Sequence, residues 1–292
     1  LIARAISPEV VQRLQQHFEV QSNQEDVVWS PAELAQQLQG KDGVLTTGSQ
    51  RIDAELLAAC PQLKIVANMA VGYNNFDVHA MTDAGVQGTN APDVLTETTA
   101  DFGFALLMAT ARRITESEHY LRAGLWKDWH YDLFAGAEVH GSTLGILGMG
   151  RIGQAIARRA AYGFGMEVIY HNRSRLDATL EAECKASYVG KQELLERADH
   201  LMLVLPFTPE NRHTIGAAEI ARMKPTATLI NIARGGIVDD AVHDHRRHLV
   251  LNRDGIGGQI GDFPGQLLFA WQGFGGSPAA QVVQGHHVVP LS

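Results

Sequence analysis

The chain has 292 residues, a net charge of −8 and 45% hydrophobic residues. This length is enough for a large core and favours two domains. No apolar run reaches the ~20 residues of a membrane span, and we expect neither a membrane partner nor a secretory signal. The negative charge and the lack of a long basic block argue against a nucleic-acid partner. Cys60 and Cys184 lie in unrelated contexts and are expected to be reduced thiols of a cytoplasmic protein.

The first third of the chain alternates strand-length apolar runs with helical patterns. Helices are predicted at 8–18, 31–38 and 53–59, and strands at 43–47 and 63–69. Such a repeat predicts a parallel sheet covered on both faces. We assign residues 1–96 to a first domain.

The loop at 70–78 follows the last of these strands. Open α/β sheets bind ligands at the carboxyl ends of their strands. Gly72 allows successive backbone N–H groups to point together and bind an anion. A tight connection with Phe76 and Val78 in the core fits the same residues, and the spacing does not decide between the two.

Residues 95–122 have the pattern of one long helix, with Thr96 as its candidate N-cap and Thr98 in its first turn. The segment that follows, up to Ser142, has no clear period and is rich in aromatic side chains. These are Trp126, Trp129, Tyr131 and Phe134. An aromatic-rich arm of this kind is typical of a subunit interface. We therefore predict a homodimer formed through an arm at 117–142.

The run at 144–147 precedes Gly148, Gly150 and Gly153, which have the spacing G-x-G-x-x-G. A helical pattern and a second strand-length run, at 166–170, complete a β-α-β unit. The glycines allow a tight turn, close approach of a pyrophosphate, and close packing of helix on strand. The helix N-terminus adds N–H groups and a positive dipole end. The unit predicts dinucleotide binding in a second domain at 97–240.

Residues 171–175, at the end of the second strand, indicate which dinucleotide binds. NAD sites usually have Asp or Glu there, for the ribose 2′-hydroxyl. This chain has Asn172, Arg173, Ser174 and Arg175, which could bind a 2′-phosphate. Solvated surface arginines are the alternative. Because the missing acid and the added bases agree, we predict NADPH as the preferred cofactor, with NADH as a second one.

Strand-length runs at 200–205 and 228–233 continue the pattern. Arg234 follows the second of them, with Gly235 and Gly236 allowing a sharp turn. A guanidinium at a carboxyl strand end suits bidentate binding of a carboxylate. Its pairing with a nearby acid is the structural alternative.

Four stretches carry a resemblance to a known family. They are AVGYNNFDV, PDVLTETTADFGFALLMATARR, LGILGMGRIGQAIARRA and LPFTPENRHTIGAAEIARMKPTATLINIARGGIVDD. They resemble the D-isomer-specific 2-hydroxyacid dehydrogenases, and among these the glyoxylate/hydroxypyruvate reductases and the 2-ketogluconate reductases. The resemblance covers residues 1 to about 240, in order.

The resemblance implies an α/β fold in which a Rossmann domain is inserted in a flavodoxin-like substrate domain, with the active site in the cleft. It implies NADPH-dependent reduction of small 2-keto acids such as glyoxylate, hydroxypyruvate or 2-ketogluconate to D-2-hydroxyacids. The backbone of Val71 and Gly72 would hold the substrate carboxylate, and Arg234 would bind it and polarise the keto oxygen. The cofactor residues we assign are Thr98, Gly148, Gly150, Arg151, Ile152, Gly153, Asn172, Arg173, Ser174, Arg175, Leu205, Pro206, Ile232 and Ala233.

The tail at 241–292 departs from the family. The family's glutamate and histidine, which supply the proton to the keto oxygen, would fall near Phe263 and Val282. Neither side chain transfers protons. The alternative function is therefore a dinucleotide-binding protein of this family with little or no catalysis.

The tail also has an unusual composition, without Glu, Lys or Met. It shows no helical or strand period, so we expect an irregular segment. We interpret it as the product of a reading-frame shift or sequence error at about Ala241. His243, His245 and His248 are ligand-like, but the arginines between them disfavour a cation, and no metal site is assigned.

Overall fold

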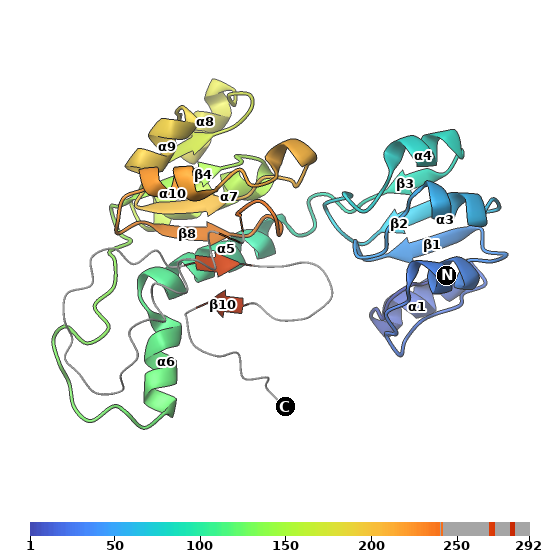
Figure 1. Ribbon diagram of the computed structural model, residues 1–292, viewed down its shortest axis with the longest axis horizontal. Coiled ribbons are helices and arrows are strands. Elements are labelled where there is room, and N and C mark those ends of the chain that lie inside the picture. Colours follow the sequence, from blue (N-terminus) through green and yellow to red (C-terminus); the bar gives the residue numbers. More distant parts are fainter. Residues whose placement is uncertain (240, 242–268, 272–280, 284–292) are drawn as a thin grey trace. The chain divides into compact units, whose positions relative to one another are not determined.

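The structure is a computed structural model that describes residues 1–239, 241, 269–271 and 281–283 (Figure 1). The chain divides into two compact units, Leu1–Leu95 and a second that begins at Thr96. Each unit is an α/β structure with a largely parallel sheet of its own. The predicted α/β class is thus confirmed.

Unit 1, Leu1–Leu95, is built on a parallel sheet of order β1-β2-β3. Its strands are β1 (Gly43–Thr46), β2 (Ile65–Asn68) and β3 (Gln87–Thr89), and its helices are α1 (Pro8–Gln15), α2 (Pro31–Gln37), α3 (Ala54–Ala59) and α4 (Val78–Asp83). Side chains of Ser30, Asp53 and Asp77 cap α2, α3 and α4 by accepting backbone N–H groups of the first turn. The core of the unit includes Leu38, Ile52 and Val66.

Two expectations for unit 1 need correction. The predicted helix at 8–18 ends at Gln15 and buries none of its residues, and Val10 and Phe18 are exposed. A tight connection at 70–78 was expected to place both Phe76 and Val78 in the core. Phe76 does pack against the core, but Val78 is exposed. Val78 begins α4, a helix that the sequence pattern did not predict.

Unit 2 is built on a seven-stranded sheet of order β10-β9-β8-β7-β4-β5-β6. Its strands are β4 (Thr143–Leu147), β5 (Glu167–His171), β6 (Ala186–Tyr188), β7 (His200–Leu203), β8 (Thr228–Asn231), β9 (Phe269–Trp271) and β10 (Gln281–Val283). The chain enters at the central β4, adds β5 and β6 on one side, and then adds β7, β8 and β9 on the other. This strand order is that of the Rossmann fold, whose ligand crevice lies where the order reverses. Here the reversal falls between β4 and β7.

The two faces of this sheet each have a core, to which the described α-helices of unit 2 except α6 contribute buried residues. Figure 1 shows the helices of the unit. They are α5 (Thr96–Ala111), α6 (Ile114–Arg122), α7 (Arg151–Arg158), α8 (Ala178–Cys184), α9 (Lys191–Arg197) and α10 (Ala217–Arg222), with a π-helical turn at Arg159–Gly163 and a 3₁₀ turn at Pro209–Asn211. Alternate residues of β5 serve opposite cores: Val168 and Tyr170 join the one under α5 and α7, and Ile169 joins the one under α9 and α10.

The predicted long helix at 95–122 is wrong in one respect, because it is broken between α5 and α6. Arg113 lies between them in the left-handed region with φ 55°. The last carbonyl of α5, at Ala111, accepts the N–H of Ala137 (2.8 Å) from the returning arm. A Cβ at Gly136 would stand 2.1 Å from that carbonyl oxygen, so only glycine permits this approach. The arm therefore ends α5, because its N–H group occupies the Ala111 carbonyl that would accept an N–H of the next turn in a continuing helix.

The tail was expected to be irregular, but two short strands in it join the sheet: β9 pairs parallel with β8, and β10 pairs antiparallel with β9. The backbone of Val282, the position expected for the family's histidine, belongs to β10. Phe263 and the histidines at 243, 245 and 248 lie outside the described residues.

Candidate active site

The turn after β4 is shaped by two glycines that the packing requires. Gly148 has φ 104°, and its N–H donates to the carbonyl of His171 at the end of β5 (3.1 Å). A Cβ there would stand 2.7 Å from the backbone of Val204 and Leu205, and a Cβ at Gly153 would stand 2.5 Å from the Gly148 oxygen. Glycine is therefore necessary at both positions. The contact with Leu205 also lies at the strand-order reversal between β4 and β7.

Gly150 differs from these two because the protein itself does not require it. A Cβ at Gly150 would meet no atom within 4 Å, and no side chain caps the helix α7 that begins after it. The N–H groups of a first helical turn, here from Arg151 and Ile152, have no acceptor within the helix. Open space above an uncapped helix start is what a pyrophosphate needs. The residues present thus fit the phosphates of a dinucleotide.

Asn172 connects the glycine turn to the end of β5. Its Oδ1 accepts the N–H of Met149 at 2.6 Å, and its own carbonyl accepts from the Tyr188 hydroxyl at 3.3 Å. The side chain of Met149 is fully buried. Asn172, predicted as a cofactor residue, therefore positions the glycine turn through the backbone of Met149.

The two arginines predicted to bind a 2′-phosphate have different surroundings. Arg175 binds Glu181 through Nε (2.9 Å) and Nη2 (2.7 Å), and the Tyr170 hydroxyl donates to the same carboxylate (2.7 Å). These hydrogen bonds hold the pKa of Glu181 below its usual value, that from Arg175 contributing most. Arg173 and Ser174 are exposed, and Arg173 has no hydrogen bond or ion pair to any residue that the structure describes. Arg173 is therefore the guanidinium available to a ligand.

The remaining cofactor residues predicted in this unit follow β7 and β8 or begin α5. Ile232 and Ala233 are buried, Leu205 is half-buried against the core, and Pro206 is exposed. Since parallel strands end at one edge of a sheet, these residues lie along the same edge as Gly148 and Asn172. Thr98 is exposed in the first turn of α5.

Arg234 is held at this edge by a turn that Asn231 organises. The Asn231 amide donates to the Arg234 carbonyl (3.1 Å) and accepts the N–H of Ala233 (2.9 Å). One Nη atom of Arg234 donates to the Ala233 carbonyl at 2.8 Å. Burial lowers the pKa of the guanidinium, because water solvates its charge only in part. Such a cation gains strongly from an anionic ligand.

The substrate loop predicted in unit 1 follows β2. Val71 and Tyr73 are exposed and Gly72 is half-buried. The Asn68 side chain at the end of β2 donates to the Gly72 carbonyl (2.8 Å), and that of Asn90 donates to the Val71 carbonyl (2.8 Å). The loop is therefore fixed by hydrogen bonds from its own unit.

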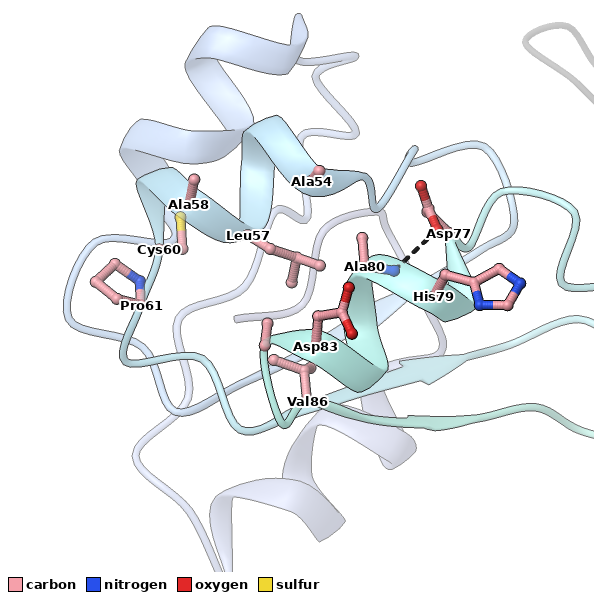
Figure 2. A pocket seen from close by; sticks show the side chains of 11 residues that line it. Ala54, Leu57, Ala58, Cys60, Pro61, Asp77, His79, Ala80, Asp83 and Val86 are labelled. Atoms are coloured by element: carbon pink, nitrogen blue, oxygen red, sulfur yellow. Dashed lines mark hydrogen bonds between the residues drawn. The ribbon is translucent and has the colours of Figure 1, made fainter.

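Unit 1 also has a pocket of about 590 Å³ between α3 and α4 (Figure 2). Leu57, Cys60, His79 and Asp83 are among its lining residues. Asp77, at its edge, is used to cap α4 through the N–H of Ala80 (3.0 Å). No residue that the sequence predicts for binding or catalysis lines this pocket.

His200 does not replace the family's histidine, because its ring is used in the core. It is fully buried, its Nε2 lies 3.1 Å from the Glu138 carbonyl, and its Nδ1 lies 2.7 Å from the Thr228 hydroxyl. Burial lowers its pKa, which favours the neutral ring. This histidine joins the end of the arm to the sheet.

Sequence reasoning missed several residues that hold the site. Three of them are asparagines whose side chains donate hydrogen bonds to backbone carbonyl groups: Asn68, Asn90 and Asn231. The fourth is Glu181, whose carboxylate binds Arg175. The three asparagines stand at or directly after a strand end, a signal that many loops share, whereas Glu181 lies within helix α8 and has no such signal. Among the described residues, no cluster could hold a metal ion, and no helix is long and apolar enough to cross a membrane.

Comparison with known proteins identifies related sequences and related structures. The sequence model of the D-isomer specific 2-hydroxyacid dehydrogenase NAD-binding domain matches residues 104–243. The glyoxylate reductase of Thermococcus onnurineus is 46% identical over 243 residues, which are 82% of this chain and 72% of that protein. The chain belongs to the D-isomer-specific 2-hydroxyacid dehydrogenase family.

Further members of the family have similar sequences and folds. The glyoxylate reductase of Pyrococcus furiosus is 44% identical over 242 residues, covering 82% of this chain and 71% of that one. Among solved structures, a 2-hydroxyacid dehydrogenase from Polaromonas has a TM-score of 0.78 at 33% identity, covering 85% of this chain and 77% of that one. A glyoxylate reductase from Paecilomyes thermophila has a TM-score of 0.74 at 29% identity, with the same shares. The family recognised from the sequence motifs is thus confirmed, and its members are oxidoreductases.

Proposed function

We propose that this 2-hydroxyacid dehydrogenase reduces small 2-keto acids with NADPH, and that glyoxylate is its substrate, with hydroxypyruvate and 2-ketogluconate as further ones. What carries the proposal is the turn at Gly148–Gly153, with Gly150 open above an uncapped helix, in a chain 46% identical to a glyoxylate reductase. NADPH preference is supported by Arg173 and Ser174 at the end of β5, where an NAD site would have an acid.

The roles of the residues follow from their chemistry. NADPH supplies the hydride for C2 of the keto acid. The backbone N–H groups of Val71 and Gly72 hold the substrate carboxylate, and Arg234 binds it and stabilises negative charge on the keto oxygen. The hydrogen bonds of Asn231 orient the Arg234 backbone before the substrate arrives. Arg151 and Ile152 give backbone N–H groups to the pyrophosphate.

A second candidate function is dinucleotide binding with little turnover. The observation that favours it is the sequence at the positions of the family's glutamate and histidine, near Phe263 and Val282. Acid–base assistance is typically worth about 10² to 10⁴-fold in rate. A chain without it would bind NADPH and the keto acid but reduce the keto acid slowly.

We also propose a homodimer formed through the arm at 117–142. The supporting observation is the exposure of its aromatic side chains, 77% for Trp129 and 86% for Tyr131. Large exposed apolar patches usually mark interaction surfaces. The free, buried thiols of Cys60 and Cys184 support a reducing compartment, for which we propose the cytoplasm.

One experiment separates the two functions and tests Arg234. NADPH fluorescence titration gives the Kd of the cofactor, and absorbance at 340 nm follows its oxidation with glyoxylate. We expect tight binding and measurable oxidation, with kcat/KM lowered by about 10 to 100-fold in Arg234→Gln, as for loss of a hydrogen bond to a charged group. Arg222→Gln, an exposed arginine on α10, is the control and should leave both values unchanged. Binding without oxidation would select the second function.

A further inference from the structure

Three successive carbonyl groups in the loop after β2 are held by the rest of unit 1. The Ala70 oxygen accepts the backbone N–H of Ala91 at 3.0 Å. The Val71 oxygen accepts from Asn90 Nδ2 at 2.8 Å, and the Gly72 oxygen accepts from Asn68 Nδ2 at 2.8 Å. The segment after β3 and the end of β2 therefore fix the orientation of consecutive peptide groups.

This anchoring determines where the N–H groups of the same peptides point. In a planar trans peptide, the C=O of one residue and the N–H of the next point in opposite directions. With the carbonyls of Ala70, Val71 and Gly72 turned toward their donors, the N–H groups of Val71, Gly72 and Tyr73 point away from them. None of these N–H groups donates to an acceptor in the part of the chain that the structure describes. Consecutive N–H groups without acceptors are a receptor for an anion.

Asn68 cannot reverse its amide within this arrangement. Its Oδ1 accepts from the Thr46 hydroxyl (3.0 Å), and its Nδ2 also approaches Asn75 Oδ1 (3.3 Å). Asn68 and Thr46 are both buried. A reversed amide would place its oxygen against the carbonyl of Gly72 and lose these bonds. Asn68 is thus a rigid anchor, whereas Asn90 is exposed and can be changed without opening the core.

We propose that Asn90 is a positioning residue for substrate binding: it turns the peptide between Val71 and Gly72, so that the N–H groups of Val71, Gly72 and Tyr73 together receive the substrate carboxylate. The inference deepens the proposed function and depends on it for the identity of the ligand. It adds the N–H of Tyr73 to the receptor, and it assigns a role to a side chain that does not touch the substrate.

Asn74 provides a matched control in the same loop. It is exposed, like Asn90, and makes no hydrogen bond to any described residue. Asn90→Ala removes the donor to the Val71 carbonyl, and Asn74→Ala removes the same side chain without removing a hydrogen bond. The pair Asn90→Asp and Asn74→Asp repeats the comparison with an isosteric side chain and an equal change of charge.

The probe is oxamate, an unreactive carboxylate with the shape of a 2-keto acid, added to the full chain with NADPH. We expect its addition to shift the assigned amide resonances of Val71, Gly72 and Tyr73, and its uncharged methyl ester to leave them in place. Asn90→Ala should raise the Kd of oxamate by about 3 to 10-fold, the range for loss of one neutral hydrogen bond. The Kd of NADPH should stay unchanged, and Asn74→Ala should match the wild type in both.

Equal oxamate affinities in the two alanine variants would overturn the role of Asn90. Absence of amide shifts at 71–73 on addition of oxamate would overturn the receptor. Failure of the proposed reduction has a different signature, since the amide shifts would occur while NADPH remained unoxidised with glyoxylate.

Discussion

At the scale of single residues, the two arginines after β5 carry the same charge but not the same availability. Arg175 is held in a bidentate pair with Glu181, whereas Arg173 is exposed and without a partner among the described residues. We therefore expect Arg173→Ala to raise the Kd of NADPH by about tenfold, as for loss of one charge-assisted contact at the surface. Arg175→Ala should have a smaller effect.

NADH is the internal control for this prediction, because it lacks the 2′-phosphate. Fluorescence titrations of both cofactors against wild type and the two variants would measure the ratios. If Arg173→Ala weakened NADH as much as NADPH, the assignment of Arg173 to the 2′-phosphate would be wrong.

The same residues show how far the sequence can predict a site. The missing acid at 171–175 was visible in the sequence, as were the glycines and Arg234. Each of these features has a fixed spacing from a predicted strand. The pairing of Arg175 with Glu181 was not visible, although the two are close in sequence. It depends on how α8 packs beside Tyr170, whose hydroxyl binds the same carboxylate. Side-chain partners of this kind follow from tertiary packing, which local patterns do not contain.

At the scale of elements, the three glycines of the turn have distinct physical roles that two substitutions can separate. Gly153→Ala places a Cβ 2.5 Å from the Gly148 oxygen, and this overlap outweighs the ~1 kcal/mol that alanine offers in a helix. We expect a loss of about 1 to 3 kcal/mol in the free energy of unfolding. Gly150→Ala meets no atom within 4 Å, so only the weaker preference for alanine at an N-cap should lower stability, by a smaller amount.

Gly150→Ala should instead weaken cofactor binding. Its new methyl group would occupy the space at the start of α7 where the pyrophosphate approaches, so the Kd of both NADPH and NADH should rise by at least about tenfold. Chemical denaturation and fluorescence titration of the two variants would check both parts. A Gly150→Ala protein with wild-type affinity would show that the phosphates do not lie at this turn.

The elements themselves were easier to predict than their ends. The strands at 43–47, 63–69, 200–205 and 228–233 were found within two residues of their observed bounds, because apolar runs mark buried parallel strands. The break between α5 and α6 was not found. Its cause is the carbonyl of Ala111 accepting from Ala137, a contact between residues 26 positions apart. Such a contact leaves no periodicity in the helix.

At the scale of the whole molecule, the sheet of unit 2 follows the Rossmann order that the β-α-β unit led us to expect. The tail does not follow the expectation, because β9 and β10 extend this sheet from a segment without any clear period. Strand pairing at a sheet edge uses backbone groups and demands little of the side chains. The sequence pattern therefore could not indicate it.

Two exposed aromatic residues of the arm, Trp129 and Tyr131, are available to join two copies of the chain. Within the arm, Phe134 packs against Tyr120 (ring centroids 5.1 Å apart) and under the guanidinium of Arg113 (5.2 Å), so the arm has its own internal support. Trp129 and Tyr131 take no part in this and are exposed. Each would bury roughly 150–250 Å² in an interface, a substantial part of the about 800 Å² per partner that a stable dimer needs.

Sedimentation equilibrium at micromolar concentration should therefore give twice the chain mass of 31.8 kDa. The double variant Trp129→Asp/Tyr131→Asp should sediment as a monomer, because four carboxylates would then face one another in the apolar centre of the symmetric interface. Phe18→Asp is the control, since Phe18 is also an exposed aromatic residue (66%) but lies after α1, outside the arm. A monomeric wild type, or a double variant that remained dimeric, would show that the exposed rings of the arm do not join two copies of the chain.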